Sequence, residues 1–184
     1  MQQNHESYMR RALELAARGL GEVEPNPAVG CVVVRDGHIL GEGWHKKFGG
    51  PHAEIEALAD CRAKGHDPGG ATLYVTLEPC CHTGKMGPCS RAVIAAGVAQ
   101  VVIASGDPTR LAGGGMKEIV AAGIDVQVGV CRDEAEALNA PFYKHARTGQ
   151  PWVILKWAQS IDGKLAWKNP PAEGPWISNA QSRQ

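Results

Sequence analysis

The sequence has no excess of either charge and no long apolar run, and each absence excludes a class of protein. Its 19 Lys and Arg residues balance 19 Asp and Glu residues, so the formal net charge is zero. Surfaces that bind nucleic acid broadly are basic, so we expect no nucleic-acid partner. No apolar run approaches the roughly 18 residues of a membrane-spanning helix, and the N-terminus lacks the apolar region of a secretory signal. We therefore expect a soluble, cytoplasmic protein with no membrane partner.

Six cysteines occur without any sign of secretion, which favours free thiols or metal ligands over disulfides. Buried cysteines often serve as small apolar side chains, and we assign that role to Cys31, Cys61 and Cys131. The other three cysteines lie within ten residues of one another, at positions 80, 81 and 89.

Apolar periodicity bounded by glycine and proline predicts alternating helices and strands. Helices are expected over residues 5–18, 52–64, 89–97 and 115–123, with a further one that starts near 132 and is interrupted at Pro141. Strands are expected over residues 29–35, 38–44, 71–77, 100–105 and 124–130. Asp36-Gly37 between the first two strands is a strong hairpin signal. The order predicts an α/β fold, with a mixed central sheet, helices on both of its faces and parallel later strands.

The composition changes near residue 148, where RTGQP (147–151) is a plausible linker. We expect a first domain over residues 1–148. Residues 152–167 predict a new strand and turn, but a tail of this length cannot bury a core of its own. Residues 149–184 are therefore expected to be the beginning of an incomplete second domain.

Two short motifs predict a zinc site. Zinc deaminases combine a His-x-Glu element with a Pro-Cys element and one further cysteine, and their glutamate moves protons without binding metal. His52-Ala53-Glu54 and Pro79-Cys80 match in type and order. The further cysteine usually lies three positions after the first, where this chain has Thr83. Three residues remain as candidates for the third ligand, namely Cys81, His82 and Cys89.

We choose Cys89 as the third ligand, because it places the starts of two helices at the metal, where their dipoles favour thiolate. His52, Cys80 and Cys89 then hold zinc, with Glu54 as the catalytic acid and base. A purely structural zinc site is the alternative. It would use Cys81 or His82 as a fourth ligand and leave Glu54 without a role.

These same residues resemble a known family. HAEIEAL (52–58), VTLEPCCHTGKMGPC (75–89), PNPAVGCVVV (25–34) and GEGWHKKFGGPHAE (41–54) are similar to the deaminase domain of the bifunctional riboflavin-biosynthesis deaminase/reductase. The resemblance covers residues 5–184 and implies a three-layer α/β/α cytidine-deaminase-like fold with one zinc per chain. It implies the phosphorylated pyrimidine 2,5-diamino-6-ribosylamino-4(3H)-pyrimidinone 5′-phosphate as the substrate.

The resemblance also implies substrate contacts for Asn26, His45, His82 and Lys85. The last two lie in the insert between Cys80 and Cys89, where cationic donors suit a phosphorylated sugar. The loop DPTRLAGGG (107–115) departs from the family's usual segment, so its contribution is open at this stage.

Residues 155–167 resemble the opening of the family's NADPH-dependent reductase domain. Residues that match its opening motifs are Lys156, Ala158, Ser160, Asp162 and Trp176, of which Ala158 and Trp176 are assigned to the cofactor. A cofactor pocket needs the rest of that domain, so NADPH is expected only with a complete reductase domain, and we expect no reductase activity from this chain.

Two other functions remain open from the residues alone. One is a zinc deaminase of a nucleoside, a free base or tRNA, although neutral charge and the missing Cys-x-x-Cys count against tRNA. The other is an inactive zinc-binding fragment. Association into a homo-oligomer is a further possibility that the sequence does not decide.

Overall fold

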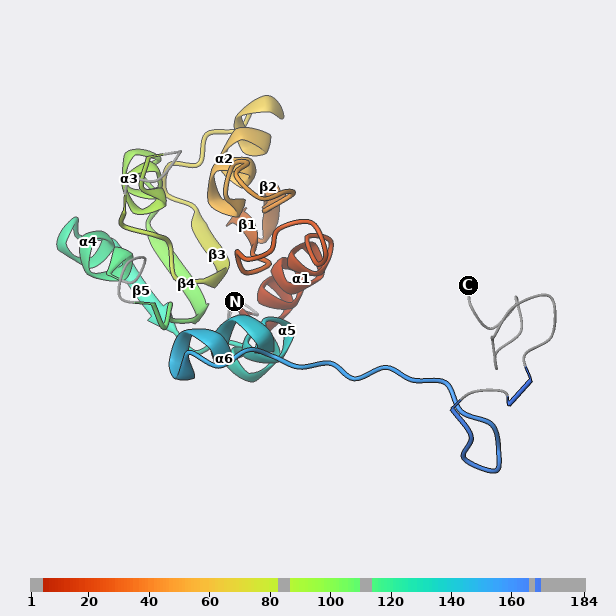
Figure 1. The fold of residues 1–184 in the computed structure, drawn as a ribbon. Coiled ribbons are helices and arrows are strands. Elements are labelled where there is room, and N and C mark those ends of the chain that lie inside the picture. The colour runs from red at the N-terminus through yellow and green to blue at the C-terminus, as the bar shows by residue number, and fades with distance from the viewer. Residues whose placement is uncertain (1–4, 83–86, 110–113, 166–167, 170–184) are drawn as a thin grey trace. The chain divides into compact units, whose positions relative to one another are not determined.

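A five-stranded mixed sheet forms the centre of the computed structural model, which describes residues 5–82, 87–109, 114–165 and 168–169 (Figure 1). The strands, in chain order, are β1 (Gly30–Arg35), β2 (His38–Trp44), β3 (Thr72–Leu77), β4 (Gln100–Ser105) and β5 (Asp125–Val128). They lie in the order β2-β1-β3-β4-β5. β1 pairs antiparallel with both β2 and β3, whereas β3, β4 and β5 are parallel. The predicted mixed sheet with parallel later strands is confirmed.

The hairpin between β1 and β2 follows from its two turn residues. Asp36 and Gly37 have φ angles of 53° and 80°, and Arg35 pairs directly with His38. Positive φ at both central positions is the geometry whose twist matches that of the flanking strands. The Asp-Gly signal in the sequence therefore identified this turn correctly.

Helices cover both faces of the sheet. They are α1 (His5–Ala17), α2 (Ala53–Ala63), α3 (Cys89–Ala95), α4 (Gly115–Ala121), α5 (Arg132–Leu138) and α6 (Ala140–Thr148). Figure 1 shows α2, α3 and α4 on one side and α1, α5 and α6 on the other. The predicted three-layer α/β/α arrangement is confirmed.

Two apolar clusters lie on the two faces of the sheet. Along β1, Cys31 and Val33 join the cluster under α2, α3 and α4, whereas Val32 and Val34 join the one under α1 and α5. All four are fully buried, because successive strand residues point to opposite faces and helices cover both. This burial explains why β1 is an unbroken apolar run in the sequence.

The interruption at Pro141 divides two helices. α5 ends at Leu138 and α6 begins at Ala140, with Pro141 in its first turn. Proline is tolerated there because the first N–H groups of a helix have no intrahelical acceptor. The two helices meet at Asn139, a buried residue.

The cysteines agree with the prediction except at one position. All six are free, and Cys31 and Cys61 are buried as expected. Cys131 is only half-buried: it precedes α5 with φ of 55° and packs against the cluster under α1 and α5, so its apolar role holds but full burial does not.

Residues 152–184 form a separate unit from residues 1–151. The strand predicted near its start is wrong, because residues 151–160 have no regular secondary structure. An isolated apolar segment does not form a stable strand by itself. The predicted turn does form, with Ser160 N–H bonded to the Lys164 carbonyl at 2.9 Å and Gly163 N–H to that of Ser160 at 2.9 Å.

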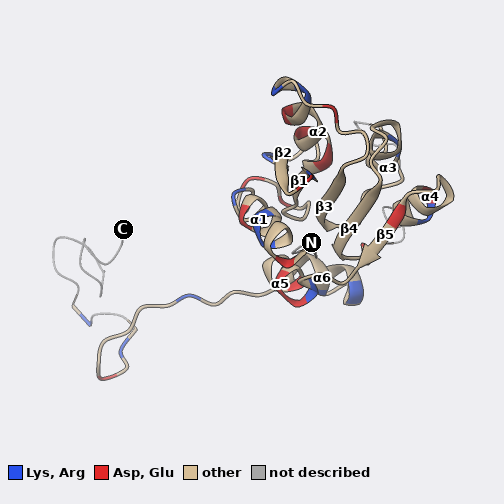
Figure 2. Cartoon of the chain, turned by 180° about the vertical axis from the view of Figure 1, so that it is seen from behind, with Lys and Arg blue, Asp and Glu red and all other residues tan. Residues whose placement is uncertain are grey.

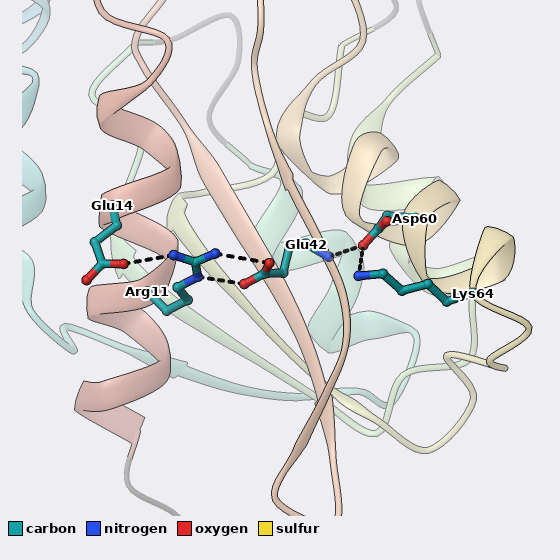
Figure 3. Close-up of polar contacts among 5 residues, drawn as sticks. All are labelled: Arg11, Glu14, Glu42, Asp60 and Lys64. Atoms are coloured by element: carbon teal, nitrogen blue, oxygen red, sulfur yellow. Dashed lines mark hydrogen bonds and ion pairs between the residues drawn. The ribbon is translucent and has the colours of Figure 1, made fainter.

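Charged side chains link the two helical layers across the edge strand β2 (Figure 3). The Arg11 guanidinium on α1 donates to both carboxylate oxygens of Glu42 on β2, at 2.6 and 3.1 Å, and lowers the pKa of Glu42. The Glu42 N–H donates to Asp60 on α2 at 2.8 Å, and Lys64 pairs with the same carboxylate oxygen. Such charges also protect a sheet edge from pairing with other chains.

Charges of both signs are mixed along the described helices. Figure 2 shows acidic and basic residues interspersed over α1, α2 and α5, while β3 and β4 carry none. Among the described residues, no helix combines the length and apolarity needed to cross a membrane.

The close approach of α2 to β2 depends on Gly43. A Cβ atom there would lie 2.3 Å from the backbone nitrogen of Ala57 and 2.7 Å from the Ala53 carbonyl oxygen. We expect Gly43→Ala to lower the free energy of unfolding by about 2 kcal/mol or more, because helix backbone cannot move aside as a side chain can. Denaturant unfolding measures the change. Gly87→Ala is the control, since apart from the chain neighbours of Gly87 no atom of the described residues lies within 4 Å of a Cβ placed there. Equal losses in both variants would contradict the role of the close approach.

Candidate active site

Three potential metal ligands meet where β3 ends and two helices begin. His52 directly precedes α2, Cys80 follows β3, and Cys89 is the first residue of α3. The His52 Nδ1 atom lies 3.2 Å from the Cys89 sulfur and 3.6 Å from the Cys80 sulfur. In the described part of the chain, these three form the only group of His, Cys, Asp or Glu side chains identified as able to share an ion.

The cluster fits zinc in both chemistry and spacing. Zinc prefers imidazole and thiolate ligands, and its bond lengths in a tetrahedral site place a nitrogen and a sulfur ligand about 3.6 Å apart. The two His52-to-sulfur distances lie close to that value. Three protein ligands leave a fourth position, the arrangement of catalytic rather than structural zinc sites.

The neighbouring candidates lie outside this cluster. Cys81 is half-buried and His82 is exposed, and neither belongs to the group of three. Adjacent residues seldom direct two side chains at one tetrahedral centre, which accounts for the exclusion of Cys81. A closed structural site that uses either residue is therefore not the arrangement observed.

Hydrogen bonds among the three residues stabilise charge on sulfur. A bond with the Cys89 side chain, supported by His52 and by the Cys89 N–H at 3.5 Å, lowers the pKa of Cys80 to about 4. The bond to Cys80 also raises the pKa of His52. The hydrogen bond with Cys80, together with burial, raises the pKa of Cys89 well above its usual range. Thiolate is the form of cysteine that binds metal, so the metal-free site favours it at Cys80 and not at Cys89.

Glu54 lies in the first turn of α2, two residues after His52, and is only 3% exposed. Burial raises its pKa to about 7. It lines the same cavity as His52 and Cys80. A carboxyl group that gains and loses a proton near neutral pH can act as both general acid and general base.

A cavity of about 250 Å³ opens beside the cluster. The segment before β1, the residues after β3, the loop after β4 and Phe142 of α6 form its walls, so both helical layers contribute. The predicted substrate residues Asn26, His45 and His82 all line it.

His45 is held from both sides of its ring. Its Nδ1 atom lies 2.9 Å from the Pro51 carbonyl oxygen and its Nε2 atom 3.2 Å from the Asn26 amide nitrogen. A carbonyl only accepts hydrogen bonds, so Nδ1 carries the proton and Nε2 accepts from Asn26. Burial lowers the pKa of His45, which agrees with a neutral ring that orients the Asn26 amide.

Two residues in or near the site had no signal in the sequence. Asn139 binds both backbone groups of Ala28 at 2.8 Å, and so attaches the segment before β1 to the start of α6. Glu78 lines the cavity itself, as do Asp107 and Thr109 of the loop whose contribution the sequence left open. An isolated Asn or Glu at a loop end has no distinctive spacing, so only the structure reveals these contacts.

The remaining predicted residues lie elsewhere. Lys85 and Trp176 are outside the described residues. Ala158 is exposed and belongs to the unit formed by residues 152–184.

The fold and the His-Cys-Cys cluster define a zinc-binding domain of the cytidine-deaminase class. Residues 2–105 match the family described as the cytidine and deoxycytidylate deaminase zinc-binding region. This match covers more than half of the chain, which therefore belongs to that family. Zinc is the cofactor of the family, and the cluster has suitable ligands for it.

More specific relatives carry the name riboflavin biosynthesis protein RibD. The chain is 50% identical over 180 residues to RibD of Escherichia coli, covering 97% of this chain and 48% of the relative. It is 46% identical over 179 residues to RibD of Aquifex aeolicus, covering 97% and 49%. The chain thus spans about half the length of the curated relatives it matches.

Solved structures agree with these relatives. A diaminohydroxyphosphoribosylaminopyrimidine deaminase/5-amino-6-(5-phosphoribosylamino)uracil reductase from Thermotoga maritima has a TM-score of 0.87 at 46% identity, covering 95% of this chain and 50% of its own. The Rib2 deaminase of Aspergillus oryzae has a TM-score of 0.61 at 22% identity, covering 78% and 94%. This second likeness supports the fold alone.

Zinc content tests the ligand set. We expect Cys80→Ser and Cys89→Ser to purify with much less than one zinc per chain, because a serine hydroxyl is a poor substitute for thiolate. Cys81→Ser is the matched control and should retain zinc at the wild-type level. Elemental analysis of the purified proteins measures this, and loss of zinc from Cys81→Ser would show that the ligand set is wrong.

The raised pKa of Glu54 predicts that the free energy of unfolding of the zinc-free protein depends on pH. Between about pH 4.5 and 7 the folded protein keeps the Glu54 proton while the unfolded chain loses it, so wild-type stability falls as pH rises through this window. Glu54→Gln lacks this loss and should be more stable than wild type at pH 8, by on the order of 3 kcal/mol. Denaturant unfolding with chelator at pH 5 and pH 8 measures it. A difference between the two proteins that does not change with pH would contradict the raised pKa.

Proposed function

We propose that this chain hydrolytically deaminates 2,5-diamino-6-ribosylamino-4(3H)-pyrimidinone 5′-phosphate to 5-amino-6-ribosylaminouracil 5′-phosphate and ammonia. The observation that carries the proposal is the buried carboxyl of Glu54, which shares a cavity wall with His52 and Cys80. Support for the substrate comes from the deaminase named in the Thermotoga relative, at 46% identity.

His52, Cys80 and Cys89 would hold the zinc ion. When bound, zinc supplies Lewis-acid chemistry that lowers the pKa of water toward 7. A substrate in the cavity would have access to the bound zinc, because His52 and Cys80 both line that cavity. The third ligand, Cys89, is the first residue of α3. It is buried at 1% exposure and does not line the cavity.

Glu54 carries the protons of the reaction. As a carboxylate it removes a proton from the attacking water, whose oxygen bonds to the ring carbon that bears the exocyclic amine. The protonated Glu54 then donates this proton to the adjacent ring nitrogen. Glu54 next takes the remaining proton from the added hydroxyl group and passes it to the amine. The carbon–nitrogen bond breaks, ammonia leaves and a carbonyl remains. A pKa of about 7 suits both directions of transfer.

The cavity residues assigned to the substrate divide by role. Asn26 presents its amide to the pyrimidine, and His45 orients that amide through the bond at 3.2 Å. His82 and Lys85, in the insert after Cys80, supply cationic or hydrogen-bonding groups for the phosphate. The insert therefore accounts for selection of a phosphorylated substrate.

We further propose that residues 1–148 are the deaminase domain. Residues 149–184 would correspond to the opening of the reductase half that the Thermotoga relative's name includes. Ala158 and Trp176 would there belong to the NADPH-binding part.

The substrate assignment is tested with purified, zinc-loaded protein and a panel of amines. The panel contains the phosphorylated diaminopyrimidine, its dephosphorylated form, cytidine and dCMP. We expect ammonia release, with the uracil product detected by mass spectrometry, from the phosphorylated diaminopyrimidine in preference to the others. Preferential deamination of cytidine or dCMP would replace the proposed substrate, and no deamination at all would overturn the proposal.

Glu54→Gln tests the mechanism. It should keep its zinc but lose a factor of at least about 100 in kcat, because the amide cannot relay protons. Glu56→Gln is the matched control, since Glu56 lies on the same helix and pairs with Lys46 at 2.7 Å. A near-native rate in Glu54→Gln, or an equal loss in Glu56→Gln, would show that Glu54 is not the proton carrier.

A further inference from the structure

The Glu78 side chain binds both described ends of the loop that joins β4 to α4. Glu78 lies between β3 and Pro79, and its own N–H donates to the Ser105 carbonyl at 2.9 Å. Its Oε2 atom accepts from the Asp107 N–H at 3.2 Å. Its Oε1 atom accepts from the N–H groups of Gly114 at 2.8 Å and Met116 at 3.1 Å. Three backbone donors therefore converge on one carboxylate.

This carboxylate serves as the cap of α4. The first N–H groups of a helix have no intrahelical acceptor, and Gly114, which precedes α4, has no side chain to accept from them. Glu78 takes that role from a distant part of the sequence. The start of α4 also lies directly on the turn of Pro79 and Cys80, since a Cβ at Gly115 would lie 1.8 Å from the Pro79 carbonyl oxygen.

The other end of the loop forms part of the cavity wall. Asp107 and Thr109 both line the cavity. The Asp107 Oδ1 atom accepts from the Thr109 N–H at 2.7 Å and from its hydroxyl at 2.6 Å. These bonds make residues 107–109 a tight turn, and the bond from Asp107 N–H to Glu78 fixes that turn to the sheet.

We infer that Glu78 is a positioning residue for substrate binding. It holds the turn of Asp107 and Thr109 against the end of β3, and so keeps these two side chains on the cavity wall. It acts through them because its own oxygens already accept three backbone N–H groups. A carboxylate and a hydroxyl suit neutral donors such as sugar hydroxyls and ring amino groups, whereas a carboxylate repels phosphate. The wall therefore selects the donor-rich, uncharged part of the substrate.

Glu78→Gln tests this inference, and its kinetic part rests on the proposed deamination. The glutamine amide provides one acceptor oxygen and one donor nitrogen, so one end of the loop must lose its bonds. Hydrogen–deuterium exchange should become about tenfold faster at Asp107, or at Gly114 and Met116. We expect KM for the phosphorylated diaminopyrimidine to rise about tenfold, with kcat and zinc content close to wild type.

Asp60→Asn is the matched control. It makes the same carboxylate-to-amide change at a residue that accepts the backbone N–H of Glu42 on β2 and does not line the cavity (Figure 3). It should leave KM, kcat and the exchange of residues 107–116 unchanged. An equal rise in KM in both variants would show a general effect of lost stability and would overturn the inference.

Two other results would also overturn it. One is unchanged exchange at Asp107, Gly114 and Met116 in Glu78→Gln. The other is loss of zinc and of kcat at constant KM, which would place the role of Glu78 at the Cys80 turn. If Glu78→Gln does not fold, Glu78→Asp replaces it, because the shorter carboxylate keeps the charge but does not reach both Asp107 and Gly114, and exchange should again become faster at one end of the loop. The inference then requires a higher KM at unchanged kcat.

The exchange measurement separates this inference from the proposed function. If wild type fails to deaminate the phosphorylated diaminopyrimidine, the proposed function is wrong, whereas faster exchange in Glu78→Gln still establishes that Glu78 holds the loop. If wild type deaminates this substrate and Glu78→Gln shows neither faster exchange nor a higher KM, only the role of Glu78 is wrong.

Discussion

The packing of α2 against β1 and β2 is the contact on which the rest of the site depends. His52 and Glu54 lie at the start of this helix, and Gly43 allows the helix backbone to approach the strand closely. The same packing buries Glu54 to 3% exposure. A carboxyl group in that position loses its hydration, which favours the protonated form and makes the group useful near neutral pH. Stability and chemistry are therefore set by one helix–sheet interface.

The pKa values of two neighbouring groups of the site are shifted in opposite directions. Hydrogen bonds lower the pKa of Cys80 to about 4, whereas burial raises that of Glu54 to about 7. The Cys80 thiolate is thus suited to bind a cation, and the Glu54 carboxyl is suited to exchange protons. Both groups line the same cavity. The difference arises from the surroundings, because Cys80 has hydrogen-bond donors directed at it and Glu54 is governed by desolvation. Buried carboxyls of this kind reduce stability and are characteristic of functional sites.

Around these groups, backbone hydrogen bonds to side chains fix the cavity wall. Asn139 holds the segment before β1, and Glu78 holds the loop after β4. His45 performs a similar function for the amide of Asn26. Each of these side chains is mostly or fully buried, so its hydrogen bonds do not compete with bulk water. These bonds hold the described ends of the loop and the segment before β1 in place.

Much of the fold could be predicted because local signals agreed with the tertiary structure. Asp36-Gly37 specified the hairpin, and apolar runs such as β1 indicated strands covered on both faces. The segment after residue 151 shows the limit of this reasoning, since its apolar pattern predicts a strand and residues 151–160 have no regular secondary structure. Cys131 shows the same limit on a smaller scale, because residue type alone did not reveal its position at the start of α5.

By itself, the sequence determined which residue types are available for zinc chemistry, because His-x-Glu and Pro-Cys have a recognisable order and spacing. For the third ligand it offered Cys81, His82 and Cys89, of which Cys89 was the prediction because of its place at the start of a helix. Only the tertiary structure shows that Cys89 lies beside His52 and Cys80, because the start of α3 lies next to the residues that follow β3. The tertiary structure alone also showed that Glu78 lines the cavity and that Asn139 holds the segment before β1. Their roles depend on backbone groups many residues away, and such contacts leave no pattern in the linear sequence.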